Sequence, residues 1–365
     1  MSEWQTFCLK DLVKIFGGST PPTNNPKNYG NKIRWITAKD LSTLQGRYIK
    51  KGSRSISRLG FKSCSTFLLP KHAILFSVRA PIGYTAIISK RSCTDRGLMG
   101  LVPNKKIYFE FLYYLLRYHK DNISNMGVGT TFKGISKPAL GLFQVKIPPT
   151  YYEQQKIART LSVLDQKIEN NHKINELLHN FAHKVYEYYF KYKPKNAKLE
   201  QIIIENPKSS IMVKNAQKTQ DKYPFFTSGD NTLSYPKAII DGRNCFLNTG
   251  GNAGIKFYVG KASYSTDTWC IGANEFSDYL YLLLSSIKTH INQSFFQGTS
   301  LKHLQKNLLK KYPIYMPSVH EIKKFNQIIM PLLTLISINT RTSKKLEQIR
   351  DFLLPLLLKQ QVKPK

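Results

Sequence analysis

The chain has 365 residues, of which 41% are hydrophobic, so it can fold into two globular domains with buried cores and is not a disordered protein. It carries 55 Lys and Arg against 22 Asp and Glu, a formal net charge of +33. So strong a positive charge predicts a polyanionic partner, either nucleic acid or an anionic membrane surface.

The five cysteines are scattered and none forms a Cys-x-x-Cys pair. This pattern argues against a disulfide framework and a zinc site, and it predicts a reducing, cytoplasmic environment. The first residues lack the apolar segment of a signal peptide. The longest apolar runs, 328–338 and 352–358, are shorter than a membrane span requires. We therefore expect a cytoplasmic protein with no membrane partner.

Residues 1–148 have the pattern of a mixed α+β domain and carry 24 Lys and Arg against six Asp and Glu. Short candidate strands, such as 33–36 and 73–78, alternate with turns rich in Gly and Pro. The most basic stretch is RYIKKGSRSISRLGFK, residues 47–62. Because Lys and Arg neutralise phosphates, we expect nucleic-acid contacts from Arg47, Lys50, Lys51, Arg54, Arg58, Lys62, Arg79, Arg91 and Arg96.

Residues 149–193 predict one long helix. Thr150 and Glu153 have the spacing of a capping box, in which two side chains satisfy free amide groups at a helix start. Apolar residues then recur at three- and four-residue spacing, with Asn171 and Asn175 at the mid-helix seam positions. A helix of this length is not stable alone, so its seam needs a partner. The apolar seam positions are Ile157, Leu161, Leu164, Ile168, Leu178 and Val185.

Residues 194–312 show a weak second copy of the first domain. Gly83 and the predicted strand after it match Gly254 and the predicted strand after it, 171 residues later. Further matches follow in the same order. This second domain is less basic, with 15 Lys and Arg against eight Asp and Glu. The nucleic-acid contacts that we expect here come from Lys214, Lys218, Arg243, Lys256, Lys261 and Lys302.

Residues 313–360 repeat the helix pattern, and a short basic tail, 361–365, follows. Ser318 and Glu321 have the capping-box spacing, whereas Pro331 should kink or break the first turns. The predicted seam residues are Ile328, Leu332, Leu335, Leu346, Ile349, Leu353 and Leu356. The first three of these follow the first three seam residues of the earlier helix by 171 positions.

The order globule, helix, globule, helix predicts the architecture. Because the connection after the first helix is short, the second helix must run back antiparallel to meet the first along the seam. We therefore expect an α+β fold in which two globular domains are joined by two long antiparallel helices, a coiled coil, with an internal pseudo-two-fold duplication. A nucleic-acid reader of this kind contacts two sites at a fixed spacing.

The sequence offers no catalytic constellation. It lacks the (Asp/Asn/Ser)-Pro-Pro-aromatic pocket motif of an adenine methyltransferase and a phosphate-binding GxxxxGK[ST] loop. The glycine-rich run 250–254 precedes a strand-like segment, so we interpret it as a hairpin turn. His179 and His183 lie four residues apart on the first long helix but lack a third ligand, so we interpret them as a solvated face. We expect neither an enzyme nor a metal site, and no cofactor in this chain.

Three segments resemble the specificity subunit of type I restriction–modification enzymes: GGSTPPTNNPKNYGNKIRWITAKDL (17–41), VKIPPTYYEQQKIARTLSVLDQKIE (145–169) and RDFLLPLLL (350–358). The resemblance covers essentially the whole chain. It implies that 1–148 and 194–312 are target-recognition domains, each reading one half of a split double-stranded DNA site. The helices 149–193 and 313–360 would set the distance between the half-sites and dock two adenine methyltransferase subunits.

The resemblance also implies that S-adenosylmethionine binds to those partner subunits and that restriction subunits cleave the DNA. The second domain lacks the Gly-Ser-Thr-Pro-Pro and Trp-Ile-Thr-Ala-Lys-Asp-Leu segments of the first, so we expect it to read a different sequence. Two alternatives stay open: an orphan or structural coiled-coil nucleic-acid-binding protein without partner enzymes, and an enzyme with fused recognition domains. Loss of affinity on changing the spacer by one base pair would favour the split DNA site.

Overall fold

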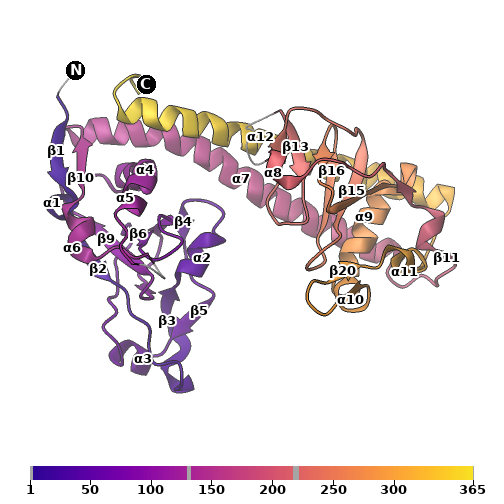
Figure 1. Cartoon of the computed structure of the whole chain (residues 1–365), viewed down its shortest axis with the longest axis horizontal. Coiled ribbons are helices and arrows are strands. Elements are labelled where there is room, and N and C mark those ends of the chain that lie inside the picture. Colours follow the sequence, from indigo (N-terminus) through magenta and orange to yellow (C-terminus); the bar gives the residue numbers. More distant parts are fainter. Residues whose placement is uncertain (1–2, 130–132, 217–221, 365) are drawn as a thin grey trace. The chain divides into compact units, whose positions relative to one another are not determined.

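The computed structural model describes residues 3–129, 133–216 and 222–364, and the chain divides into two compact units. Unit 1 comprises Met1–Asn170 and Ser343–Lys365, and unit 2 comprises Asn171–Thr342. Two helices of 40 residues, α7 (Tyr151–Phe190) and α12 (Val319–Leu358), contribute to both units (Figure 1). Each unit therefore contains one globule and parts of both long helices.

Both long helices begin at the predicted capping boxes. The Glu153 amide donates to Thr150 Oγ1 at 3.2 Å, and the Ser318 amide donates to Glu321 Oε2 at 2.9 Å. Pro331, which was predicted to kink or break the second helix, does not break it, because α12 continues through it. Ile329 and Leu333, on either side of this proline, are buried in the core of unit 2 and hold the helix there.

The two long helices run antiparallel within each unit, as predicted. In unit 1, Asp165 of α7 pairs with Arg350 of α12 at 2.6 Å. In unit 2, Asn339 Nδ2 of α12 donates to Asn175 Oδ1 of α7 at 2.9 Å. Tyr189, which comes later in α7, contacts Phe325, which comes earlier in α12. Asn175, one of the two asparagines predicted at the mid-seam of the first helix, therefore contacts Asn339 of the second.

The predicted seam residues are buried or half-buried in α7 but only partly so in α12. Ile157, Leu161 and Ile168 are buried, and Leu164, Leu178 and Val185 are half-buried. In α12, Leu332, Leu346, Leu353 and Leu356 are half-buried, but Ile328, Leu335 and Ile349 are 37%, 41% and 47% exposed. The buried apolar residues of α12 are instead Ile322, Phe325, Ile329, Leu333, Ile336, Leu354, Leu357 and Leu358. Because α12 packs on a globule as well as on α7, its buried face is displaced from the simple two-helix seam.

The globule of unit 1 contains a five-stranded sheet with two buried faces. In spatial order its strands are β2 (Val13–Gly17), β9 (Leu98–Pro103), β6 (Ile74–Ser77), β7 (Thr85–Ile88) and β4 (Tyr48–Ile49). Side chains alternate between the faces of a strand. Ile74 and Phe76 join the cluster of α4 (Phe109–Tyr118) and α7, whereas Leu75 joins a cluster on the other face. All four residues of β6 are therefore buried.

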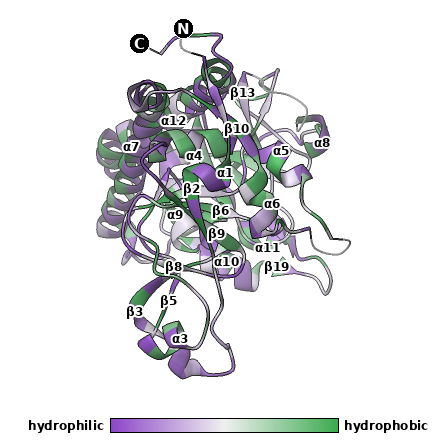
Figure 2. Ribbon diagram, turned by 90° about the vertical axis from the view of Figure 1, so that its left-hand side faces the viewer, coloured by the Kyte–Doolittle hydropathy of each residue, from purple (hydrophilic) through white to green (hydrophobic). Residues whose placement is uncertain are grey.

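A smaller lobe, which we call the distal lobe, lies on the side of this sheet away from α7 (Figure 1). It contains β5 (Arg54–Ile56), β3 (Tyr29–Ile36), β8 (Cys93–Thr94) and α3 (Arg58–Lys62). Figure 2 shows hydrophilic segments around α3 and apolar segments on the central strands. Unit 1 also contains β1 (Gln5–Cys8), α1 (Leu9–Leu12), α2 (Ala38–Ser42), α5 (Lys120–Asn125), α6 (Lys137–Leu142) and β10 (Gln144–Ile147).

The globule of unit 2 contains a four-stranded and a three-stranded sheet. The first has the order β12 (Ile204–Glu205), β18 (Thr268–Gly272), β15 (Arg243–Asn248) and β16 (Ile255–Val259). The second has β14 (Leu233–Tyr235), β13 (Tyr223–Phe226) and β17 (Ser263–Tyr264). Its other elements include β11 (Ala197–Lys198), α8 (Val213–Ala216), α9 (Ser277–Ser286), α10 (Lys288–Ser294), β19 (Phe296–Gln297), β20 (His303–Leu304), α11 (Lys306–Lys310) and β21 (Pro313–Ile314).

The two globules share a topology, which confirms the predicted internal duplication. In the smaller sheets, β3 pairs parallel with β8 and antiparallel with β5, and β13 pairs parallel with β17 and antiparallel with β14. In each unit an early strand pairs with the strand before a long helix, β1 with β10 and β11 with β21. The run 250–254 joins the antiparallel strands β15 and β16, so the predicted hairpin is also confirmed.

Candidate nucleic-acid interface

The distal lobe of unit 1 is ordered by a small core and by a close backbone contact. Its buried core residues are Trp35, Ile56 and Cys93. Helix α3 starts at Ser57, whose Oγ accepts a hydrogen bond from the Gly60 amide at 3.0 Å. A Cβ atom at position 60 would lie 2.0 Å from the Asn28 carbonyl oxygen. Glycine therefore allows α3 to approach the loop before β3, which fixes where the cations of α3 lie.

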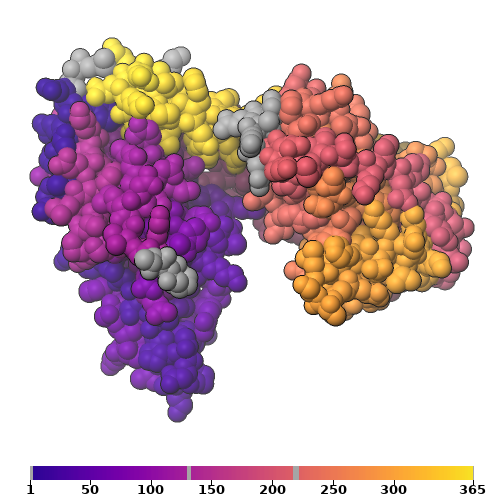
Figure 3. Space-filling view, in the orientation of Figure 1, coloured from indigo at the N-terminus to yellow at the C-terminus, as the bar shows by residue number. Residues whose placement is uncertain are grey.

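The basic stretch 47–62 places most of its cations on the surface of this lobe. Its exposed members are Lys50, Lys51, Arg54, Arg58 and Lys62. The Arg54 guanidinium lies 4.1 Å from the ring centre of Tyr29, a contact that orients this side chain. Arg79, Arg91 and Arg96 are also exposed, in the connections after β6, β7 and β8. In Figure 3 the distal lobe is the indigo, tapered end of unit 1.

Asp40, which was not among the predicted residues, orders a loop of the candidate interface. Its Oδ2 accepts from the Thr37 amide and its Oδ1 accepts from the Ser53 amide, both at 2.8 Å. Burial by itself raises the pKa of Asp40, but the hydrogen bonds from Ser53 and Thr37 bring it below the usual value. Asp40 thereby ties the loop that carries Lys50 and Lys51 to the start of α2. The Thr-x-x-Asp spacing within Trp-Ile-Thr-Ala-Lys-Asp-Leu is the signal that could have found it.

The equivalent region of unit 2 has its own core and its own exposed cations. Its buried core is Phe226, Phe246, Tyr258, Ala262, Tyr264 and Cys270. Lys214, Lys261 and Lys302 are exposed, so they can contact a polyanion. Lys218 lies outside the described residues. For Lys214, Lys261 and Lys302, as for the exposed cations of unit 1, DNA contact stays a prediction.

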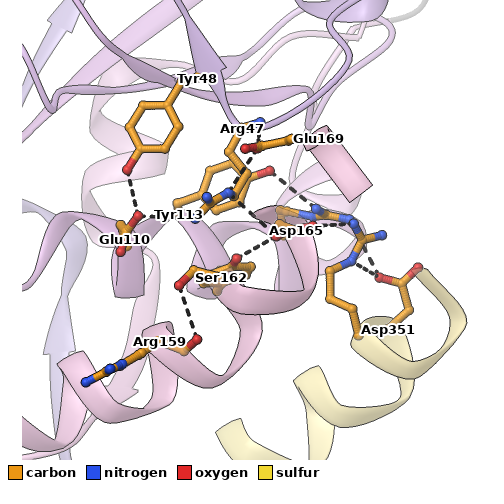
Figure 4. A network of polar contacts seen from close by, with 12 residues as sticks. Arg47, Tyr48, Glu110, Tyr113, Arg159, Ser162, Asp165, Glu169 and Asp351 are labelled. Carbon is orange, nitrogen blue, oxygen red and sulfur yellow. Dashed lines mark hydrogen bonds and ion pairs between the residues drawn. The ribbon is translucent and has the colours of Figure 1, made fainter. Parts of the chain in front are cut away.

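The prediction for Arg47 is wrong, because its side chain is 3% exposed and is held by carboxylates (Figure 4). Its Nη1 lies 3.1 Å from Glu110 Oε1, and its Nε lies 3.1 Å from Glu169 Oε1. Burial alone would lower the pKa of Arg47, but the surrounding groups, Tyr114 and Glu169 first, raise it above its ordinary value. A guanidinium so enclosed stays charged but does not reach a phosphate.

Arg243 and Lys256, for which nucleic-acid contact stays a prediction, both have partners within unit 2. Arg243 forms a bidentate ion pair with Asp278, and its Nη1 donates to Thr334 Oγ1 at 2.9 Å. Lys256 Nζ donates to the carbonyl oxygens of Thr227, at 2.6 Å, and Gly229. Burial lowers the pKa of Lys256. Both cations are therefore committed to contacts within unit 2, which local sequence cannot reveal because their partners lie far away in the chain.

The described part of the chain contains no group of three His, Cys, Asp or Glu side chains that could hold a metal ion. His179 is not fully solvated, because its Nδ1 lies 3.4 Å from Tyr281 OH, and burial lowers its pKa. All five cysteines are free thiols. Within the same described ranges, none of the helices combines the length and hydropathy that crossing a bilayer requires.

The chain thus has two compact units, each with a globule that contains the same small three-stranded arrangement and with parts of both long helices. The family model of the type I restriction modification DNA specificity domain matches the chain twice, over residues 1–180 and 195–348. The chain is 29% identical to the type I restriction enzyme MjaIX specificity subunit of Methanocaldococcus jannaschii, over 98% of this chain and 93% of that one.

The fold is also similar to a solved structure. The type I restriction–modification system S subunit of M. genitalium has a TM-score of 0.64 and 17% identity, with 97% of this chain and 96% of that chain covered. The chain belongs to the family of type I restriction–modification DNA specificity subunits. It is thus a non-catalytic subunit, as the sequence resemblance predicted, with two copies of the family's recognition domain.

Proposed function

We propose that this chain reads a split double-stranded DNA site, one half-site with each globule, and brings methyltransferase and restriction subunits to it. The observation that supports this most is the duplication of the small sheet, β5-β3-β8 in unit 1 and β14-β13-β17 in unit 2. In both units exposed cations accompany this sheet or the loops beside it. Cations fix a protein on phosphates, and a few further side chains then select bases.

Exposed apolar residues on the long helices support the docking of partner proteins. On α7 in unit 2, Ile174, Leu177 and Phe181 recur at three- and four-residue spacing and are 43%, 69% and 51% exposed. On α12 in unit 2, Ile328, Leu335 and Ile338 are exposed as well. Such residues form stripes on a helix, and exposed apolar stripes mark interaction surfaces. The methyltransferase subunits that dock there would carry S-adenosylmethionine.

Selection of random duplex DNA with the purified protein tests the split site. We expect two short base motifs separated by a spacer of constant length. Inserting or deleting one base pair in the spacer rotates one half-site by about 34–36° relative to the other, so affinity should fall by about tenfold. Enrichment of one continuous motif, or of no motif, would contradict the proposal.

Base-modification sequencing tests the link to methylation. Genomes of the source cell with and without this gene are compared, and N6-methyladenine should disappear at the selected split motif. Unchanged methylation at that motif would contradict the role as the specificity subunit of an active methyltransferase.

A matched pair of variants tests the docking surface. We expect Leu177→Asp to reduce co-purification of the methyltransferase subunits by at least about tenfold, since a buried charge is costly, while DNA selection is unchanged. Asn180→Asp, an exposed polar position on the same helix, introduces the same carboxylate and should leave co-purification intact. Equal effects of the two substitutions would argue against an apolar docking stripe.

A further inference from the structure

Arg47 connects the globule of unit 1 to α7 through one side chain. Its backbone amide and its Nε both donate to Glu169 Oε1 on α7, at 2.8 and 3.1 Å. Its Nη1 donates to Glu110 Oε1, on the first turn of α4 inside the globule, at 3.1 Å. The guanidinium therefore holds two carboxylates that belong to different parts of the same unit (Figure 4).

The neighbours of this arginine extend the connection to α12. Asp165 of α7 lies 4.0 Å from Arg47 and accepts hydrogen bonds from Tyr114 OH, at 2.5 Å, and from Arg350 Nη1, at 2.6 Å. Glu110 also accepts from Tyr48 OH at 2.6 Å. Most of these groups are buried, so their relative positions are fixed by directed contacts and not only by apolar packing.

Unit 2 contains a second arginine that, like Arg47, contacts both a carboxylate of its globule and a long helix. Arg243 pairs with Asp278, on the first turn of α9, and donates to Thr334 Oγ1 and to the Met330 carbonyl oxygen on α12, at 2.9 and 3.2 Å. Glu110 and Asp278 are each the second residue of the corresponding helices α4 and α9. The arginines themselves come from non-equivalent places, the connection before β4 and the first residue of β15. The same arrangement is therefore present twice with different sequence origins.

The chemistry of arginine suits a connection of this kind. Its planar guanidinium donates in several fixed directions, so it defines an angle between the groups that it joins. Replacing buried ion pairs with apolar residues is often neutral or stabilising, so such pairs are weak evidence for a role in stability alone. A role in fixing geometry explains better why each unit places an ion-paired arginine, buried in unit 1 and partly buried in unit 2, between its globule and the long helix that follows.

We propose that Arg47 and Arg243 are positioning residues that fix the orientation of each globule on the long helix that follows it. This inference rests on the proposed split DNA site. A globule held at one angle can meet its half-site only at one spacer length, whereas a globule free to tilt can follow a half-site that is shifted or rotated. The two arginines therefore set the tolerance for spacer length, and they do not select the bases of either half-site.

The test cuts each connection at its helix end and leaves the pair inside the globule intact. Glu169→Ala removes the α7 carboxylate that accepts hydrogen bonds from Arg47, and the isosteric Thr334→Val removes one α12 acceptor of Arg243. Each purified variant is measured against DNA with the selected half-sites and spacers altered by one base pair. We expect the roughly tenfold penalty of the wild type to shrink to about twofold or threefold, with half-site base preference unchanged.

Arg58→Ala and Lys261→Ala are the matched controls, one exposed cation in each unit. Each should weaken DNA binding by the same factor at every spacer length. The roughly tenfold loss of affinity on altering the spacer should therefore remain. A full penalty in both Glu169→Ala and Thr334→Val would overturn the inference, and so would an altered base preference. If Glu169→Ala does not fold, the spacer penalty of Thr334→Val alone tests the inference, and a full penalty in that variant overturns it. A wild-type protein that selects no split site would instead refute the proposed function.

Discussion

Asp165 of α7 and Arg350 of α12 form a buried ion pair of 2.6 Å in unit 1. Asp165 also accepts a hydrogen bond from Tyr114 OH, and burial followed by the negative charge of Asp165 raises the pKa of that phenol above its ordinary value. One carboxylate of α7 thus accepts hydrogen bonds from both α4 and α12.

Removing this carboxylate should therefore be costly. We expect Asp165→Ala to lower the free energy of unfolding by about 3 kcal/mol, because Arg350 and Tyr114 lose their buried acceptor. Urea denaturation measures the change. Asp351→Ala is the control, since Asp351 also pairs with Arg350 but its side chain is 57% exposed, so the loss should stay below about 1 kcal/mol. Equal losses in the two variants would show that burial does not determine the effect.

The starts of the long helices could be predicted from sequence because capping is local. Thr150 with Glu153, and Ser318 with Glu321, act across three residues, and the structure has both boxes. The duplication was visible for a similar reason, since ordered matches at a constant offset require no knowledge of contacts. Hydrophobic periodicity also found both helices, and the short connection after the first one predicted their antiparallel arrangement.

Long-range pairing could not be read from the sequence. Arg47 looks like its exposed neighbours in the basic stretch, yet its partner Glu169 is 122 residues away. The buried face of α12 was misplaced because the two-helix model omitted the globules, and Ile328 and Leu335 proved exposed as a result. Local patterns therefore identified the elements and the charge of the interface, but not which cations the fold uses internally.

The capping box of α12 should make stability depend on pH. Hydrogen bonds from the Ser318 amide and from Tyr315 lower the pKa of Glu321 from 4.5 to about 2. A carboxyl whose pKa is lower in the folded state stabilises the fold at any pH above its pKa in the unfolded chain. This contribution disappears as the pH falls from 4.5 to about 2. At pH 7, Glu321→Gln should therefore cost about 1 kcal/mol.

Denaturation of the wild type and of Glu321→Gln over this pH range is the measurement. The two stabilities should converge toward pH 2. Glu347→Gln, at a partly exposed position later in α12, controls for the loss of one negative charge. A difference that stays constant down to pH 2 would argue against the ionised capping box.

The exposed cations of α3 should contribute to the salt dependence of DNA binding. Each phosphate contact that is lost reduces the slope of log K against log salt by about 0.9. We expect Arg58→Ala and Lys62→Ala each to produce this reduction, while the base preference is kept. Lys345→Ala, at an exposed position on α12, should leave the slope unchanged. If both variants keep the wild-type slope, Arg58 and Lys62 do not contact DNA phosphates.

Asp40 should affect DNA binding without touching DNA, because it holds the loop of Lys50 and Lys51 through the Ser53 amide. We expect Asp40→Ala to lower the free energy of unfolding by about 1 kcal/mol, the usual cost of losing a helix cap, and to weaken binding to the half-site of unit 1. Asp11→Ala is the matched control, because Asp11 accepts from the Cys8 amide at the start of α1, outside the distal lobe. Its stability loss should be similar and its DNA affinity unchanged. If both variants lose affinity equally, the effect of Asp40 comes from stability alone; if only Asp40→Ala does, the loop that it holds belongs to the DNA interface.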